Sequence, residues 1–131
     1  MNEKISGQCA CGEIKYTTNS EPEFTLICQC RQCQRISGSG HAAQFAVPVS
    51  DTFIEGDIKF YDQIADSGDT VSSGFCPNCG SPMLKKTTKM PEIYFFHAGT
   101  MDDPSRFKPQ IVVYEDSKQP WDNIDPKIPR N

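Results

Sequence analysis

The sequence lacks a concentration of positive charge. Its 131 residues include 13 lysines and arginines against 17 aspartates and glutamates, which gives a formal net charge of −4 at pH 7. The densest basic stretch contains Lys85, Lys86 and Lys89, and its shortness indicates a solvated strand end. A nucleic-acid-binding domain needs a basic patch or stripe. The sequence therefore predicts a protein with no nucleic-acid partner.

Long apolar runs are also absent. Apolar residues make up 37% of the chain, and no stretch approaches the roughly 20 apolar residues that a membrane-spanning helix requires. Residues 1–6 contain no apolar segment of the kind found in signal peptides. We therefore expect a cytoplasmic protein with no membrane partner. Thiols stay reduced in that compartment, so the seven cysteines are expected to be metal ligands or catalytic groups rather than disulfides.

Helical patterns are scarce too. The 10 prolines and nine glycines indicate many turns, and one short helical segment is predicted over 31–36. Short connections favour antiparallel pairing. We predict a mainly β fold of small antiparallel sheets, in a single domain over residues 1–131 with an extended tail over 122–131. The expected strands cover 13–16, 24–28, 41–49, 58–64, 70–75, 93–97 and 111–114.

The chain does contain three groups of cysteines. They are Cys9 and Cys11; Cys28, Cys30 and Cys33; and Cys76 and Cys79. In the third group the two cysteines enclose Pro77 and Asn78, and Gly80 follows them, which is typical of half a tetrahedral zinc site. A redox pair would need a βαβ context, and no helix pattern follows the motif. We therefore interpret the third group as metal ligands.

Counting sulfurs favours one arrangement of these groups. The first and third groups together supply four thiolates, which is a complete structural zinc site. The middle group then retains three, and three protein ligands with one open position are characteristic of catalytic zinc. The reverse arrangement, with the middle and third groups forming the closed site, is not excluded by spacing. Iron in the four-thiolate site, as in rubredoxin-like proteins, is a further alternative.

The middle group suits the capture of a thiol. Three thiolates make the site negative and the metal a weak Lewis acid, whereas a thiol that binds zinc loses its proton and stays nucleophilic. Arg31 and Arg35 lie beside these cysteines. They are candidates for attracting an anionic thiol substrate, and the alternative is that they are ordinary surface arginines.

The cysteine groups lie within a longer ordered series of motifs. These are residues 7–12 (GQCACG), 28–35 (CQCRQCQR), 75–82 (FCPNCGSP), 98–104 (AGTMDDP) and 120–121 (PW). The series resembles the glutathione-dependent formaldehyde-activating enzyme family, which includes centromere protein V. The resemblance spans residues 7–121. One difference is Gln110 before Ile111, where members of the family often have histidine.

The resemblance implies a fold and a reaction. The family fold is a β-tent of small antiparallel sheets held together by zinc. The resemblance assigns Cys28, Cys30 and Cys33 to a catalytic zinc. It implies that a zinc-bound glutathione thiolate attacks formaldehyde, in a reaction classed in reverse as a carbon–sulfur lyase. The remaining cysteines, Cys9, Cys11, Cys76 and Cys79, are assigned to a structural zinc.

Other side chains are assigned simpler roles. His41 and His97 are expected to be strand histidines with local hydrogen bonds rather than ligands. Asp102 and Asp103, followed by proline, indicate a turn. Trp121 is expected to anchor the tail by packing. Four phenylalanines are expected in the core or at its rim: Phe45, Phe53, Phe60 and Phe75.

Two classes of function remain open from the sequence. One is an enzyme that adds glutathione or another small thiol to an aldehyde such as formaldehyde. The other is a non-catalytic, zinc-stabilised module that binds a protein. The third sulfur of the middle group separates them, because a purely structural clip does not need Cys33.

Overall fold

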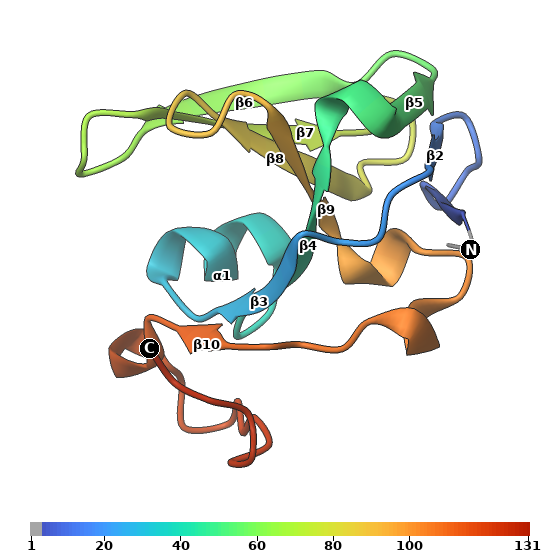
Figure 1. The fold of residues 1–131 in the computed structure, drawn as a ribbon. Coiled ribbons are helices and arrows are strands. Elements are labelled where there is room, and N and C mark those ends of the chain that lie inside the picture. The colour runs from blue at the N-terminus through green and yellow to red at the C-terminus, as the bar shows by residue number, and fades with distance from the viewer. Residues whose placement is uncertain (1–3) are drawn as a thin grey trace.

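Two β-sheets make up most of the structure, a computed structural model that describes residues 4–131 (Figure 1). β1, β2 and β5 form a three-stranded sheet, and the other strands form a seven-stranded sheet in the order β10-β3-β4-β9-β8-β7-β6. The prediction of a mainly β fold with small antiparallel sheets is confirmed. The elements are β1 (Ile5–Gln8), β2 (Lys15–Thr18), β3 (Phe24–Cys28), α1 (Arg31–Ser37), β4 (Ala42–Pro48), β5 (Thr52–Glu55), β6 (Lys59–Ile64), β7 (Thr70–Phe75), β8 (Pro82–Thr87), β9 (Ile93–His97) and β10 (Val112–Val113), with short 3-10 turns η1 (Val49–Asp51), η2 (Ala98–Thr100), η3 (Pro104–Arg106) and η4 (Glu115–Ser117).

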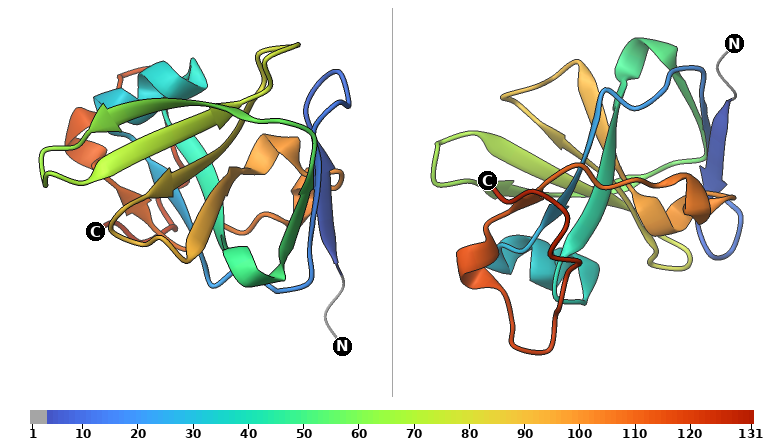
Figure 2. Two further views of the ribbon diagram at one scale, coloured as in Figure 1. Left: turned by 90° about the horizontal axis from the view of Figure 1, so that it is seen from above. Right: turned by 60° about the horizontal axis from the view of Figure 1, so that its bottom comes forward.

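The long sheet is strongly bent. β6, β7 and β8 form one wing, β3 and β10 form the other, and the central strands β4 and β9 connect them (Figures 1 and 2). Helix α1 lies in the angle between the two wings. It is the single α-helix among the residues described, and it ends at Gly38, whose φ of 73° favours glycine. The bend therefore brings one helix against a concave sheet face.

A shared core joins the small sheet to the long one. Tyr16 of β2 stacks on Phe96 of β9 with ring centroids 3.9 Å apart, and Phe45 of β4 packs 5.8 Å from the same ring. Gly7 of β1 is required at this contact, because a Cβ there would lie 2.3 Å from both Thr100 O and Tyr16 Oη. The small sheet consequently packs at backbone contact distance against η2, the turn that follows β9.

One strand pairing differs from the prediction of antiparallel sheets. β10 pairs with β3 in parallel, with Val112 opposite Ile27 and Val113 opposite Cys28. The connection from β9 runs through η2 and η3 before it returns along β3 (Figure 1). This long route permits a parallel pairing that a tight turn would not. The pairing places the chain after β10 beside the end of β3.

The C-terminal tail is not simply extended. It turns back, so that Arg130 forms a bridge with Val112 and its guanidinium bonds Glu115 at 2.7 Å. The prediction that Trp121 anchors the tail is wrong, because its side chain is 65% exposed and the neighbouring Asp122 is buried instead. Hydrogen bonds of Asp122 with Gln29 and His41 hold this turn in place of packing by Trp121.

The remaining expectations about side chains have mixed outcomes. Phe45 is buried and Phe60 packs against the core, but Phe53 is 66% exposed because β5 leaves that side chain outside the shared core. Asp102 accepts a hydrogen bond from Ser6, and Asp103 caps η3, which fits a turn. Over residues 4–131, no helix combines the length and apolar character needed to cross a membrane.

Candidate metal centres and the adjoining cavity

Four cysteines from two distant turns meet beside the small sheet. The Cys9 and Cys11 sulfurs are 3.6 Å apart, and the Cys11 and Cys76 sulfurs are 3.8 Å apart. Together with Cys79, all four sulfurs lie within 4.8 Å of one another. Zn–S bonds of ~2.3 Å in a tetrahedron place sulfurs about 3.8 Å apart. The spacing of the cluster therefore fits a tetrahedral metal ion.

Local backbone geometry explains how the turns form this cluster. Each turn has a glycine with positive φ just after its second cysteine, Gly12 at 81° and Gly80 at 79°. Backbone N–H groups point at the inner sulfurs: Ile14 N lies 3.3 Å from the Cys9 sulfur, and Cys79 N lies 3.5 Å from that of Cys76. These N–H groups stabilise negative charge on the sulfurs.

The structure separates this cluster from the middle cysteines. Cys28, Cys30 and Cys33 form their own group, with sulfurs within 4.8 Å of one another. The alternative arrangement, in which the middle and third groups share a metal, is therefore wrong. Both clusters could hold a metal ion.

The three-cysteine cluster is built at the start of α1. Cys28 ends β3, and Cys30 is the residue that caps the helix, with its sulfur accepting from Cys33 N at 3.3 Å. Cys28 is buried, while Cys30 and Cys33 are partly exposed. One strand end and one helical turn therefore bring the three sulfurs together within six residues of chain.

The charges of the three thiols are strongly unequal. Hydrogen bonds from the Cys28 and Cys33 thiols, and then from backbone N–H groups, lower the pKa of Cys30. The hydrogen bond with the Cys30 sulfur raises the pKa of Cys28. Hydrogen bonds with Cys28 and Cys30, followed by burial, raise the pKa of Cys33. The cluster thus favours one thiolate that is hydrogen-bonded by two thiols. A divalent cation would be needed to stabilise three negative charges at this spacing.

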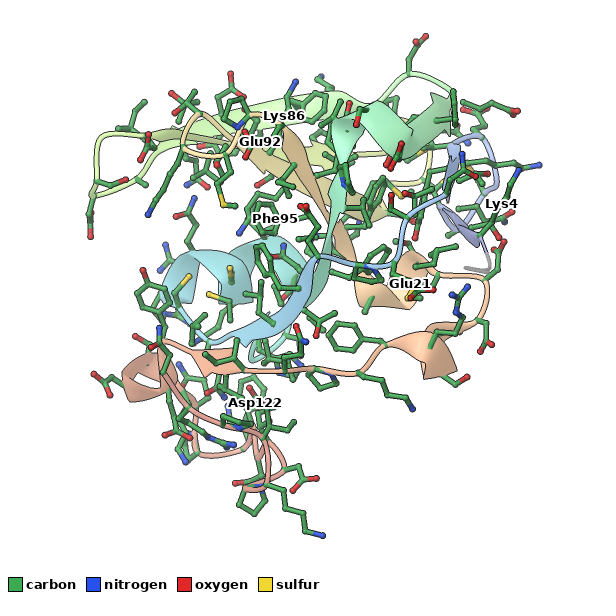
Figure 3. The ribbon with its side chains drawn as sticks, in the orientation of Figure 1. Lys4, Glu21, Lys86, Glu92, Phe95 and Asp122 are labelled. Carbon is green, nitrogen blue, oxygen red and sulfur yellow. The ribbon has the colours of Figure 1, made fainter. Side chains whose placement is uncertain are left out.

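A cavity of about 340 Å³ adjoins the three cysteines. It lies on the concave face of the long sheet, between α1 and the β6–β7 hairpin. This volume is in the range of small-molecule sites. Phe95, which is on the same sheet face, lies between α1 and the upper strands in Figure 3. The lining residues are Cys28, Cys30, Gln32, Cys33, Ile36, Ala42, Gln44, Ile64, Ala65, Asp66, Ser67, Val71, Ser73, Lys85 and Tyr114.

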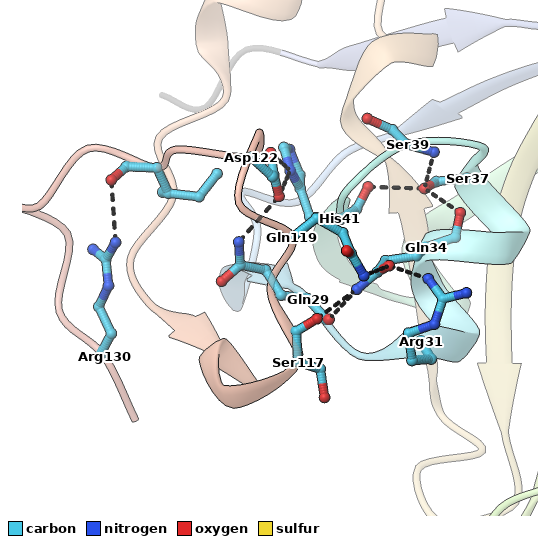
Figure 4. Close-up of polar contacts among 11 residues, drawn as sticks. Gln29, Arg31, Gln34, Ser37, Ser39, His41, Ser117, Gln119, Asp122 and Arg130 are labelled. Carbon is cyan, nitrogen blue, oxygen red and sulfur yellow. Dashed lines mark hydrogen bonds and ion pairs between the residues drawn. The ribbon is translucent and has the colours of Figure 1, made fainter.

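The tail braces the loop that carries the cysteines (Figure 4). Gln29, between Cys28 and Cys30, is fully buried, and its Nε2 donates to Asp122 Oδ2 at 3.0 Å. His41 Nδ1 lies 3.0 Å from the same carboxylate, so its partner comes from the tail and is not local in sequence. Hydrogen bonds from Gln29 and His41 lower the pKa of Asp122, against the opposing effect of burial.

A second buried glutamine completes this brace (Figure 4). Gln34 Nε2 donates to Gln29 O at 2.8 Å and to Ser117 O at 2.9 Å. Its Oε1 accepts from Gln119 Nε2 at 3.0 Å and also from Arg31. The start of α1 and the tail are therefore held together by side-chain amides.

The two candidate substrate arginines lie outside the cavity. Arg31 and Arg35 are exposed, and neither is among the lining residues. The cation that does line it is Lys85, which the sequence indicated as part of a solvated strand end. Gln110, at the position where the family often has histidine, accepts from Thr25 N at 3.0 Å and also lies outside the cavity lining.

His97 is buried, as expected, and it is uncharged near neutral pH. Burial, and to a smaller extent the positive charge of Lys85, lower its pKa from 6.5 to about 4. It belongs to neither cysteine cluster. The sequence could not have indicated Lys85, Gln44 or Asp122 as site residues, because no motif contains them. The bend of the sheet brings Lys85 and Gln44 to the cavity, and the course of the tail brings Asp122 to the cysteine loop.

Comparisons with known proteins agree with the fold. A crystal structure of a Rhodobacter sphaeroides protein superimposes with a TM-score of 0.58 at 20% sequence identity, covering 74% of this chain and 87% of that one. A comparison with curated proteins found no match. The profile described as glutathione-dependent formaldehyde-activating enzyme matches residues 4–117, a span that includes both cysteine clusters. The chain belongs to the glutathione-dependent formaldehyde-activating enzyme family.

Proposed function

We propose that this protein is a zinc-dependent enzyme that adds a small thiol, such as glutathione, to an aldehyde such as formaldehyde. The observation that supports this function best is the cluster of Cys28, Cys30 and Cys33 in the wall of a 340 Å³ cavity. Three sulfurs leave one position of a tetrahedral ion for a further ligand, and the cavity has room for a small molecule beside it.

The donor set fits zinc at both clusters. Thiolate sulfur is a ligand that zinc prefers, and four or three such donors match structural and open sites respectively. Cys9, Cys11, Cys76 and Cys79 would hold the structural ion, and the three cavity cysteines would hold the other. When bound there, zinc supplies a coordination position at which a thiol loses its proton near neutral pH.

The proposed reaction forms one carbon–sulfur bond and needs no oxidant or reductant. The substrate sulfur donates an electron pair to the carbonyl carbon, and the C=O π bond gives its pair to oxygen. The thiol's proton is carried through solvent to that oxygen, so the product is an S-hydroxyalkyl thioether. In reverse, the same step is that of a carbon–sulfur lyase.

The chain itself contributes position and electrostatics. The brace formed by Gln29, Gln34 and Asp122 fixes the loop that presents the sulfurs. Backbone N–H groups at the start of α1 favour negative charge on Cys30. Ile36, Ile64 and Val71 give the cavity apolar surface, which strengthens polar interactions inside it.

Metal content and turnover together test this proposal. We expect two zinc ions per chain after reconstitution under reducing conditions, and S-hydroxymethyl adduct formation, detected by NMR, above the uncatalysed rate. A variant with Cys28→Ser and Cys30→Ser should remain folded with one zinc ion and no activity. One zinc in the wild type, without turnover, would instead favour a zinc-stabilised protein-binding module. A coloured four-cysteine site would indicate iron.

A further inference from the structure

We propose that Lys85 and Gln44 form a recognition subsite, and that the preferred thiol carries both a carboxylate and an amide group. This inference rests on the proposed function for the identity of the bound molecule as a thiol. It is carried by two polar side chains that line the same cavity as the cysteine cluster. Lys85 forms no ion pair among residues 4–131, and Gln44 Oε1 has no hydrogen-bond partner there.

Lys85 is a cation without a carboxylate partner. Its Nζ lies 4.6 Å from the centroid of the Phe95 ring, and none of the ion pairs formed within residues 4–131 includes it. It is partly buried and lines the cavity. A half-buried ammonium beside an aromatic ring favours an anionic partner, because a single opposite charge offsets its lost hydration.

Gln44 is a buried amide that lines the cavity. Its side chain is 2% exposed, and its Oε1 is buried without a hydrogen-bond partner in the part of the chain that the structure describes. Rotation about its last torsion can turn either oxygen or nitrogen toward the cavity. A buried amide oxygen without a hydrogen bond costs free energy. A ligand with its own amide could donate to the Gln44 oxygen and accept from its nitrogen.

The strand register puts the two residues on one face of the sheet. Gln44 of β4 pairs with His97 of β9, and Lys85 of β8 pairs with Phe95 of β9. Residues opposite each other share a face, as do residues two apart on one strand. Gln44 and Lys85 therefore project to the same side, flanking β9. Lys85 also contributes to the electrostatic field at Cys33.

The rest of the cavity explains why the anion should bind at Lys85. Besides Lys85, the cysteines and Tyr114, the lining contains one ionisable side chain. It is Asp66, an exposed residue of the β6–β7 hairpin. Its negative charge disfavours a carboxylate at that side of the cavity. A thiol with its sulfur at the cysteines is thus expected to direct its carboxylate to Lys85 and its amide to Gln44.

Four thiols allow the carboxylate contact with Lys85 and the amide contact with Gln44 to be tested separately. N-acetylcysteine has a carboxylate and an amide, N-acetylcysteamine has only the amide, 3-mercaptopropionate has only the carboxylate, and 2-mercaptoethanol has neither. Their S-methyl derivatives cannot form a thiolate. NMR titration of these derivatives into labelled protein therefore reports binding to the subsite independently of turnover. Turnover of the free thiols with formaldehyde is measured in parallel.

We expect Lys85→Met to weaken the binding of carboxylate-containing probes about 10- to 100-fold, the range for a hydrogen bond to a charged group. Binding of N-acetylcysteamine derivatives should be unchanged. Lys85→Arg should retain the preference for carboxylate-containing probes. Lys86→Met is the matched control, because Lys86 lies over the Phe60 ring on the opposite face of β8 and should have no effect.

For Gln44→Met we expect a loss of about 3- to 10-fold, confined to amide-containing probes. Zinc content and thermal unfolding of each variant verify that it is folded. Equal losses for all four probes, or equal effects of Lys85→Met and Lys86→Met, would overturn the proposal. If no thiol turns over but the S-methyl probes still bind through Lys85, the proposed reaction fails and the subsite stands.

Discussion

Replacing Asp122 with alanine should loosen one metal centre and leave the other intact. The Asp122 carboxylate is buried and accepts from Gln29 at 3.0 Å, and His41 lies 3.0 Å from both of its oxygens. Hydrogen bonds to a charged group contribute about 1.5–3 kcal/mol each, and neighbouring ones are not additive. Because His41 is a quarter exposed, we expect Asp122→Ala to lower the free energy of unfolding by about 3 kcal/mol.

The effect on metal should be local. Gln29 lies between two cysteines of the cavity cluster, so its freed amide lets that loop move. Substitution of a residue that supports metal ligands typically costs 10- to 100-fold in affinity. We therefore expect zinc at the three-cysteine cluster to be released about 10- to 100-fold more readily to a coloured chelator. Release from the four-cysteine cluster, which Asp122 does not contact, should keep its wild-type rate.

Asp116→Ala is the matched control, because Asp116 is an exposed residue of η4 in the same tail. It should leave the rates of zinc release from both clusters and the unfolding transition unchanged. If Asp122→Ala lowered stability but changed the rate of zinc release from neither cluster, the brace would not be a support of the cavity cluster. Acceleration of zinc release from both clusters by the same factor would also contradict the reasoning, since it would indicate general unfolding.

Three further predictions concern the core, the pH dependence and the structural cluster. Gly7→Ala should destabilise the protein by about 1–3 kcal/mol or prevent folding, as measured by urea unfolding, because its Cβ would overlap Tyr16. His97 has a pKa lowered to about 4, so the unfolded chain takes up a proton first as pH falls. Stability should therefore be complete above about pH 6.5 and decline by up to ~3 kcal/mol toward pH 4, a decline that His97→Gln should lack. Cys76→Ser should abolish cooperative thermal unfolding, whereas Cys30→Ser should preserve it, because the four-cysteine cluster joins distant segments.

The sequence predicted the parts of the fold that local patterns determine. Strands over 24–28, 70–75 and 93–97 match β3, β7 and β9, and the short helix matches α1. β1, β5 and β8 were not predicted. β8 contains adjacent lysines that read as solvent-exposed, yet alternation along the strand sends Lys85 to the cavity and Lys86 to the opposite face.

The candidate site was predictable where the ligands themselves form motifs. Sulfur counting grouped the cysteines as the structure does, because a metal-ligand set has a fixed size. The residues around the site could not be predicted in this way. The bend of the long sheet brings Gln44 and Lys85 to one cavity, and the parallel pairing of β10 leads the chain toward the turn in which Asp122 contacts Gln29. These are tertiary effects without a local sequence signal.

The sequence separation within the two clusters has a consequence for how the protein matures. The Cys11 and Cys76 sulfurs are 65 residues apart along the chain, so closing that loop has an entropic cost before any metal can bridge them. The cavity cysteines need only a short turn, and unfolded chains can already bind metal through such local thiols. During synthesis, Cys28, Cys30 and Cys33 also emerge well before Cys76 and Cys79. We therefore expect a nascent chain to capture its first metal ion at the cavity cluster, and the four-cysteine cluster to fill only as the two sheets dock.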